Sequence, residues 1–265
     1  MARLRALSAI LLIVWLILPL IPLAIWSFAR GWAYPNLLPK IWTLQPWTFA
    51  LSDQSGVLSS LALTTGIALG VTTLSVLVGV PAGRALGLYQ FRGKALVELM
   101  ILAPIIVPGI AVALGLQTVF IRLGLNNTVA GVALVHLIPT LPYMVLVMAS
   151  VFAAYDPQTE DQARSLGASR TQVFRHVTLP AILPGIMVGA MFTFLVSWGQ
   201  YILTLTIGGG RVQTLPLLMF QFATSGRNDI TGAIAIIYIL PGVLIVILTA
   251  RSLTGRSAAL TGLGR

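Results

Sequence analysis

Six long uncharged runs constrain the fold of this chain more than any other feature of its sequence. They cover residues 6–29, 54–83, 99–121, 123–155, 177–210 and 230–250. A helix needs about 20 consecutive apolar residues to cross the hydrocarbon core of a bilayer. Only 8% of the residues are charged, whereas soluble domains contain about 25% charged residues. The chain is therefore predicted to be an all-α integral membrane protein.

The runs predict six transmembrane helices, near residues 7–28, 57–82, 96–120, 129–152, 183–206 and 231–250. The first run follows Arg3 and Arg5, as a signal peptide would, but it is longer than a usual signal-peptide core and no clean small-residue cleavage site follows it. We expect an uncleaved anchor. The predicted organisation is an anchor helix and periplasmic segment over 1–56, a transmembrane domain over 57–252 and a cytoplasmic tail over 253–265.

The net charge of +10 could indicate nucleic-acid binding, but the placement of the basic residues indicates membrane topology instead. Cytoplasmic loops of membrane proteins carry an excess of Lys and Arg. With both termini in the cytoplasm, the inner segments would hold eleven basic residues and the outer segments five. The inner set is Arg3, Arg5, Arg84, Arg92, Lys94, Arg164, Arg170, Arg175, Arg251, Arg256 and Arg265, and the outer set is Arg30, Lys40, Arg122, Arg211 and Arg227. No nucleic-acid partner is expected.

The longest inner connection, about 153–182, gathers charge and carries signals for two short helices. Asp156 followed by Pro157 is typical of a helix start, and Gly167 is a natural left-handed residue after a helix over 157–166. Ser169 with Gln172 forms the spacing of a capping box that would begin a second helix. Prolines at 180 and 184 are then expected to break that helix and turn the chain back into the membrane.

This connection resembles a motif of the inner-membrane permeases of binding-protein-dependent ABC importers. Their cytoplasmic loop reads E-A-A, three residues, G, nine residues, I-x-L-P. The corresponding positions here are Asp161, Gln162, Ala163, Gly167, Val177, Leu179 and Pro180. The spacing is complete, with Asp, Gln and Val replacing Glu, Ala and Ile at three positions. The likeness extends over about 57–250 and is greatest to the second permease of spermidine/putrescine-type systems and their thiamine, iron and sulfate relatives.

The resemblance implies a type I ABC permease fold in a bacterial inner membrane, with the 157–180 loop as a coupling helix that docks on an ATPase. It also implies an ATPase dimer, a second permease that is homologous or identical, and a periplasmic solute-binding protein as partners. The sequence has no G-x-x-x-x-G-K-[ST] phosphate-binding loop, so ATP and Mg would be bound by the partner ATPase. We expect no enzymatic activity, cofactor or metal in this chain itself.

Polar residues inside spans are costly in a bilayer, so each is a candidate for the solute pathway. The candidates fall in the outer halves of three predicted helices: Gln117, His136, Tyr143, Ser197, Gln200 and Thr204. Ser197, Gln200 and Thr204 recur at helical spacing and form one polar stripe. These residues could line an outward-opening cavity, or His136 and Gln200 could only hydrogen-bond between helices.

Two other classes of function remain as alternatives. A channel would leave the spacing of the loop motif unexplained, and an intramembrane enzyme would need a catalytic set such as G-x-S-x-G or H-E-x-x-H, which the sequence does not contain. The solute stays open. Polyamine-type relatives tend to carry an acidic pair where this chain has Ser197 to Gln200, so a neutral, zwitterionic or anionic solute fits at least as well as a polycation.

Three GxxxG spacings predict close helix packing, at Gly66 and Gly70, Gly79 and Gly83, and Gly185 and Gly189. Four prolines within predicted spans are expected to kink or break their helices: Pro104, Pro108, Pro139 and Pro142.

Overall fold

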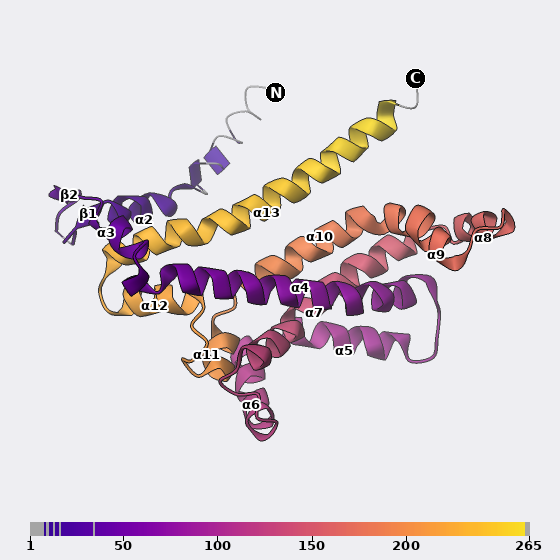
Figure 1. Cartoon of the computed structure of the whole chain (residues 1–265), viewed down its shortest axis with the longest axis horizontal. Coiled ribbons are helices and arrows are strands. Elements are labelled where there is room, and N and C mark those ends of the chain that lie inside the picture. The colour runs from indigo at the N-terminus through magenta and orange to yellow at the C-terminus, as the bar shows by residue number, and fades with distance from the viewer. Residues whose placement is uncertain (1–7, 9–10, 13, 16, 34, 263–265) are drawn as a thin grey trace. The chain divides into compact units, whose positions relative to one another are not determined.

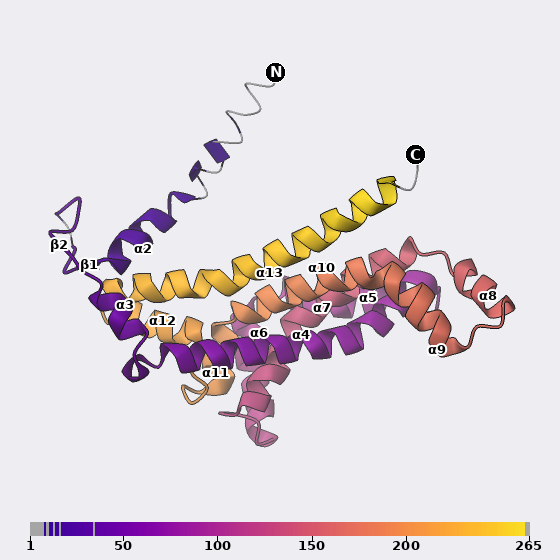
Figure 2. The same cartoon turned by 45° about the horizontal axis from the view of Figure 1, so that its top comes forward.

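The computed structural model describes residues 8, 11–12, 14–15, 17–33 and 35–262, with side chains described as far as Ala250. The described chain is mainly helical and divides into two compact units, residues 1–64 with 213–241 and residues 65–212 with 242–265. Figures 1 and 2 label the elements. The predicted N-terminal tail and the beginning of the first predicted span lie outside the described residues.

Four described helices are long and apolar enough to cross a membrane: Val57–Leu88, Val129–Ala153, Arg170–Trp198 and Asn228–Ala250. A fifth crossing results if the helix pair Lys94–Ile106 and Gly109–Arg122 forms one broken span, bent by 104°. These helices match five of the predicted runs. The first unit adds α2 (Leu20–Ser27) from the remaining run, a short helix within the described part of the predicted anchor.

The first unit combines short elements with the beginnings of two long helices. It contains α2, the two-residue strands β1 (Ala29–Arg30) and β2 (Ile41–Trp42), α3 (Gln45–Ala50), η1 (Asp53–Ser55), α12 (Leu215–Thr224) and the first residues of α4 (Val57–Leu88) and α13 (Asn228–Gly262). The Thr64 hydroxyl accepts the Leu215 backbone N–H at 2.8 Å, and Phe49 meets Phe222 edge-on at 5.9 Å. These contacts hold α12 against the beginning of α4 and α3.

The second unit is a helical bundle around α7 (Val129–Ala153) and α10 (Leu179–Trp198), which lie side by side (Figures 1 and 2). It also contains α5 (Lys94–Ile106), α6 (Gly109–Arg122), α8 (Gln158–Ser165), α9 (Arg170–Val173), η2 (Phe174–Thr178) and α11 (Ile202–Gly208). One buried core consists of Met144, Met148 and Phe152 of α7 with Ile182 of α10. Figure 1 shows α8 at the far end of the connection that joins α7 to α9.

Glycines let α4, α7 and α10 approach closely, as two of the three GxxxG spacings predict. A Cβ placed on Gly83 would clash with Met148 and the Ala149 backbone, and one on Gly185 would clash with Val151. Gly79 and Gly189 each face Met144 at similarly short range. The Gly66 and Gly70 positions differ, because an added Cβ at either one meets no atom within 4 Å.

The prolines have different effects on different helices. Val107 is extended (φ −75°, ψ 132°), because a residue before proline is disfavoured in the helical region, and the chain therefore breaks between α5 and α6 at Pro108. In contrast, α7 stays continuous through Pro139 and Pro142. The predicted break at Pro180 is wrong, since one helical run extends from Arg170 to Trp198.

The π-helical turn η2 ends at Thr178, two residues before Pro180, and explains why the helix continues through this proline. A proline lacks the N–H that would bond one turn back, and its ring collides with the preceding turn of a regular helix. A π turn has a wider i→i+5 bonding pattern, which gives the chain room for the proline ring. The predicted 183–206 span is also corrected, because it ends at Trp198 and residues 199–201 separate it from α11.

Candidate functional site

The connection between α7 and α10 has the two-helix form that its sequence predicts. Asp156 accepts the Gln158 backbone N–H at 2.9 Å through its carboxylate, and α8 follows. Gly167 has φ +88°, as expected for a left-handed residue after a helix. Ser169 and Gln172 form a complete capping box at the beginning of α9. These three local predictions are confirmed.

Glu160 of α8 is the central residue of this connection. Its side chain is only 4% exposed, although it carries a charge and lies on a short surface helix. The carboxylate accepts hydrogen bonds from Arg84 at 2.9 Å, Arg164 at 3.0 Å, Thr178 at 2.9 Å and Tyr155 at 3.2 Å. Arg84 belongs to α4, Thr178 to η2, and Tyr155 follows α7. One carboxylate therefore ties α8 to three other parts of the bundle.

The electrostatics of Glu160 follow from these partners. Burial alone raises the pKa of a carboxyl group, because it disfavours the charged form. The hydrogen bonds from Arg84, Thr178 and Tyr155 and the charge of Arg84 outweigh burial, and the pKa of Glu160 is lowered from its usual value. The group is thus held as a carboxylate at neutral pH. Arg84 also lies over the Phe152 ring, with 5.6 Å between the guanidinium carbon and the ring centroid.

The other face of α8 and its following turn are exposed. Asp161 and Gln162 face away from the bundle, and Asp161 pairs with Arg164 at 2.7 Å on the surface. Leu166 is 90% exposed, which is unusual for a large apolar side chain at a water-facing helix end, and Phe174 is 51% exposed. The helix α8 thus has a buried, anchored face and an exposed face that ends in the apolar side chain of Leu166.

The remaining residues of the loop motif differ in exposure. Ala163 is half-buried on α8, and no atom lies within 4 Å of a Cβ built on Gly167. Val177 and Leu179 are half-buried, whereas Pro180 is exposed on the continuous helix. The structure thus brings Asp161, Gln162 and Gly167 to one exposed end and places the I-x-L-P positions within the helical run behind it.

A second polar cluster joins α7, α10 and α11. His136 is 1% exposed, and its two ring nitrogens lie 3.0 Å from the Ser197 hydroxyl and 2.9 Å from the Thr204 hydroxyl. Ser197 and Thr204 are themselves buried. Three of the six predicted pathway residues therefore come together in one hydrogen-bonded set that joins three helices.

Gln200 lies in the break between α10 and α11, and its backbone carbonyl accepts a hydrogen bond from the Thr204 hydroxyl at 2.9 Å. It lines a cavity of about 310 Å³ with residues from the break between α5 and α6 and from α7. The lining residues are Pro104, Gly109, Val112, Ile138, Pro139, Gly199, Gln200, Tyr201, Ile202 and Leu203. No carboxylate is among them. Two broken helices thus meet at this cavity, a location where transporter folds bind solutes.

The two other predicted pathway residues lie elsewhere in this unit. Gln117 is half-buried on α6, and Tyr143 is half-buried on α7, where its ring stacks on Phe192 with centroids 6.2 Å apart. Neither lines the cavity at Gln200.

Sequence reasoning missed Glu160, Arg84 and Thr178 as site residues. Arg84 was assigned to membrane topology, and the loop motif was registered on Asp161, one residue after the buried carboxylate. One signal was available: Glu160 and Arg164 are four residues apart on a predicted helix, a spacing that favours an ion pair. The long-range partners could not be inferred from spacing, since Arg84 is 76 residues away.

The chain combines apolar helices long enough to span a membrane, broken helices around a cavity, and a charged helical connection anchored by Glu160. This combination is typical of a membrane transport protein. Residues 79–257 match the model of the family described as binding-protein-dependent transport system inner membrane component, and the chain belongs to this family. It is a transmembrane permease subunit of an ABC importer.

Relatives with established names agree with this assignment. The spermidine/putrescine transport system permease protein PotC of Haemophilus influenzae is 27% identical over 203 residues, which are 77% of this chain and 79% of the relative. The putrescine transport system permease protein PotI of Escherichia coli K12 is 28% identical over 226 residues, 82% of this chain and 79% of the relative.

Solved structures agree in fold. A chain of a bacterial ABC transporter that imports the acidic polysaccharide alginate matches with a TM-score of 0.72 at 17% identity, covering 94% of this chain and 95% of that one. A chain of the MetNI methionine ABC transporter matches with a TM-score of 0.56 at 17% identity, covering 77% of this chain and 99% of that one.

Proposed function

We propose that this permease works in a bacterial inner membrane as one of two paired permease subunits, with two ATPase subunits and a periplasmic solute-binding protein. The second permease is homologous or identical. Six spans place both termini and α8 in the cytoplasm. The eleven-to-five distribution of basic residues supports this orientation, and family membership supports the partners.

In this assembly the chain supplies the solute pathway, and the partner ATPase supplies the hydrolysis. The absence of a phosphate-binding loop from the sequence supports this division, because the backbone cradle and lysine that hold ATP phosphates are missing.

The coupling element is α8, and the observation that carries this proposal is the network around Glu160. Leu166, Asp161 and Gln162 form the exposed surface that docks on the ATPase. When the ATPase closes, it displaces α8. Glu160 passes that displacement to α4 through Arg84 and to the α9–α10 helix through Thr178. The ties are short and the Glu160 carboxylate is buried, so α8 moves with the spans rather than alone.

The motif residues have different roles in this mechanism. Gly167 sets the angle between α8 and α9, because its positive φ fixes the turn. Asp161, Gln162 and Ala163 belong to α8, the helix that docks on the ATPase. Val177, Leu179 and Pro180 belong to the helical run that carries the motion into the membrane.

The solute passes near Gln200, beside the two helix breaks. Gln117 and Tyr143 lie along the pathway at other depths, and His136 with Ser197 and Thr204 holds the surrounding helices in place. The cavity at Gln200 has an amide and a phenol but no carboxylate to compensate a cation. A neutral, zwitterionic or anionic small polar solute is therefore favoured over a polycation, although the named relatives carry polyamines.

Single-cysteine labelling tests the orientation, and the lack of native cysteines makes the experiment clean. In intact spheroplasts, a membrane-impermeant maleimide should label Lys40→Cys at once and Gln158→Cys only after permeabilisation. Co-purification of an ATPase with the wild-type chain should accompany this pattern. Labelling of Gln158→Cys from outside would contradict the proposed orientation and the coupling role of α8 together.

A further inference from the structure

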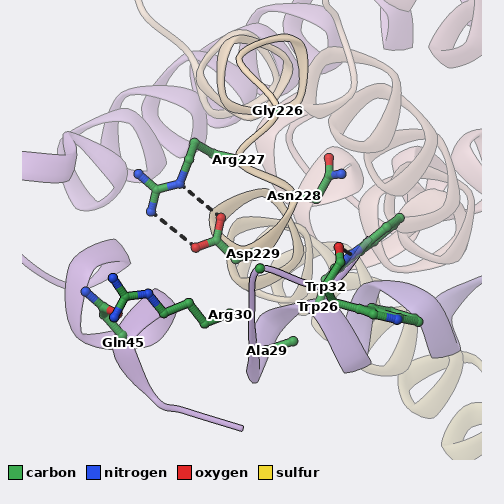
Figure 3. A pocket seen from close by; sticks show the side chains of 10 residues that line it. Trp26, Ala29, Arg30, Trp32, Gln45, Gly226, Arg227, Asn228 and Asp229 are labelled. Carbon is green, nitrogen blue, oxygen red and sulfur yellow. Dashed lines mark hydrogen bonds and ion pairs between the residues drawn. The ribbon is translucent and has the colours of Figure 1, made fainter. Parts of the chain in front are cut away.

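A polar cavity in the first unit takes no part in the proposed transport cycle. Its volume is about 460 Å³, which is far more than one water needs. It is lined by Trp26, Ala29, Arg30, Gly31, Trp32, Gln45, Gly226, Arg227, Asn228 and Asp229. Figure 3 shows Arg30 and Gln45 on the left and the two tryptophans on the right. The Arg227–Asp229 pair lies above Arg30 and Gln45 in this view.

Local structure fixes the apolar wall of this cavity. The Trp26 and Trp32 rings lie 5.3 Å apart between centroids, tilted by 54°. The Trp26 indole N–H donates to the Trp32 carbonyl at 3.4 Å, and the Trp32 indole N–H donates to the Asn36 carbonyl at 2.9 Å. Because both indole donors have partners, the rings offer a ligand mainly their apolar faces.

The charges in the cavity leave one guanidinium free. Arg227 and Asp229 form a two-point pair, with nitrogen–oxygen distances of 3.1 and 3.2 Å, and the hydrogen bond that Arg227 donates to Asp229 raises the pKa of Arg227. The Arg30 side chain is exposed, and its guanidinium takes part in no hydrogen bond or ion pair within the described part of the chain. Pairing of Ala29 with Trp42 and of Arg30 with Ile41 holds Arg30 on the edge of the β1–β2 hairpin. The cavity therefore carries one uncompensated positive charge.

Residues that neighbour the cavity-lining residues in the sequence are apolar and exposed. Leu37 is 91% exposed and Leu38 62%, both in the loop between β1 and β2, and Ile41 and Trp42 of β2 are exposed as well. The helix α2 that precedes the cavity also exposes Leu20 and Ile21. In a multi-pass membrane protein, apolar side chains of this kind beside tryptophan and arginine are typical of the level where acyl chains meet lipid headgroups.

We propose that this cavity is a binding site for the headgroup of an anionic phospholipid. Arg30 binds the phosphodiester, because a guanidinium presents paired donors that match phosphate oxygens. The side-chain amides of Gln45 and Asn228 bind headgroup hydroxyls, and the glycerol backbone packs on the indole rings. The acyl chains lie along the exposed apolar residues of the hairpin loop and α2. This site does not depend on the proposed coupling mechanism, only on the chain being a membrane protein.

Lipid titration of the purified full-length chain tests this site, with phosphatidylglycerol as the probe and phosphatidylcholine as the reference, and with binding followed by native mass spectrometry. The wild type should bind phosphatidylglycerol about tenfold more tightly, and Arg30→Gln should lose that preference. Lys40→Gln is the matched control, since it removes the same charge from the same hairpin outside the cavity. It should keep the preference within about twofold.

Two further measurements separate the possible outcomes. Arg30→Lys keeps the charge but not the paired donors, and should retain only part of the preference. Soluble glycerol 3-phosphate should compete poorly, because it lacks the apolar body; tight binding of it without lipid preference would overturn the lipid assignment. Equal losses in Arg30→Gln and Lys40→Gln would overturn the site.

A cross-linking experiment keeps the proposal testable if Arg30→Gln does not fold. A photoactivatable phosphatidylglycerol should cross-link in the wild type to peptides covering residues 26–45 and 226–229. Cross-links confined to other segments would contradict the proposal.

Discussion

Two buried polar clusters in the same unit join helices in different ways. Glu160 is a charged hub with hydrogen-bond donors from four positions, at the end of the bundle where the chain leaves its helices. His136 is a hub with two hydroxyl partners, within the helices themselves. The buried Glu160 carboxylate has cationic partners that remain partly in water, whereas the partners of His136 are two buried hydroxyls. We conclude that the first cluster is suited to transmit force and the second to hold helices together.

The largest effect should come from removing the charge of Glu160. Glu160→Gln keeps the shape but leaves Arg84 without its carboxylate and Arg164 with Asp161 alone, which should cost about 2 kcal/mol of stability and disconnect α8 from the spans. Solute-stimulated ATPase activity of the reconstituted importer should fall by about tenfold or more.

The matched control is Asp161→Asn, which removes a neighbouring charge whose side chain is 71% exposed and whose one ion pair lies on the surface. It should change unfolding by no more than about 0.5 kcal/mol. Equal losses of stability in the two variants would remove the distinction between the buried hub and the docking face.

A smaller effect is expected at the second cluster. His136→Leu leaves the Ser197 and Thr204 hydroxyls without their shared partner in the bundle, which should lower unfolding stability in detergent by about 1–3 kcal/mol. Gln200→Leu should leave stability unchanged and reduce uptake, since Gln200 lines the cavity instead of joining helices. A stable His136→Leu protein would show that this cluster does not hold the helices.

The pH dependence of stability should show the contribution of the Glu160 carboxylate. Because the pKa of Glu160 is lowered in the fold, its contribution is present above the unfolded pKa, near 4.5, and is lost as pH falls through the folded pKa. The thermal unfolding temperature in detergent should therefore not depend on this group between neutral pH and about pH 5. Below about pH 5 the unfolding temperature should fall. Glu160→Gln should remove this part of the acid sensitivity.

The smallest expected effect concerns the docking surface alone. Leu166→Ser replaces a side chain that is 90% exposed, so the stability of the chain should not change. The affinity for the ATPase should fall by about three- to tenfold, because a buried interface leucine contributes about 1 kcal/mol or more. Unchanged ATPase pull-down would place the interface elsewhere on the loop.

Local signals predicted α8 and its surroundings well, and long-range contacts set the limit. Gly167 and the Ser169–Gln172 box could be predicted because capping depends on residues within one turn. The break at Pro108 followed from the restriction that proline places on its neighbour, but continuity through Pro180 could not be foreseen, because a π turn leaves no pattern in single-sequence periodicity. The polar stripe of Ser197 and Thr204 was visible, but its histidine partner on α7 was 61 and 68 residues away.

The central claim is that α8 acts as a rigid coupling lever, and Gly167 offers the most direct test of it. A Cβ at this position meets no atom of the chain within 4 Å, so within the chain a substitution acts mainly through the backbone. At φ +88°, valine is strained by about 1–2 kcal/mol, whereas asparagine tolerates the left-handed region. Reconstituted complexes with Gly167→Val should assemble but lose solute-stimulated ATP hydrolysis, while Gly167→Asn should keep most of it. Full stimulated activity in Gly167→Val would show that this loop is not the coupling element.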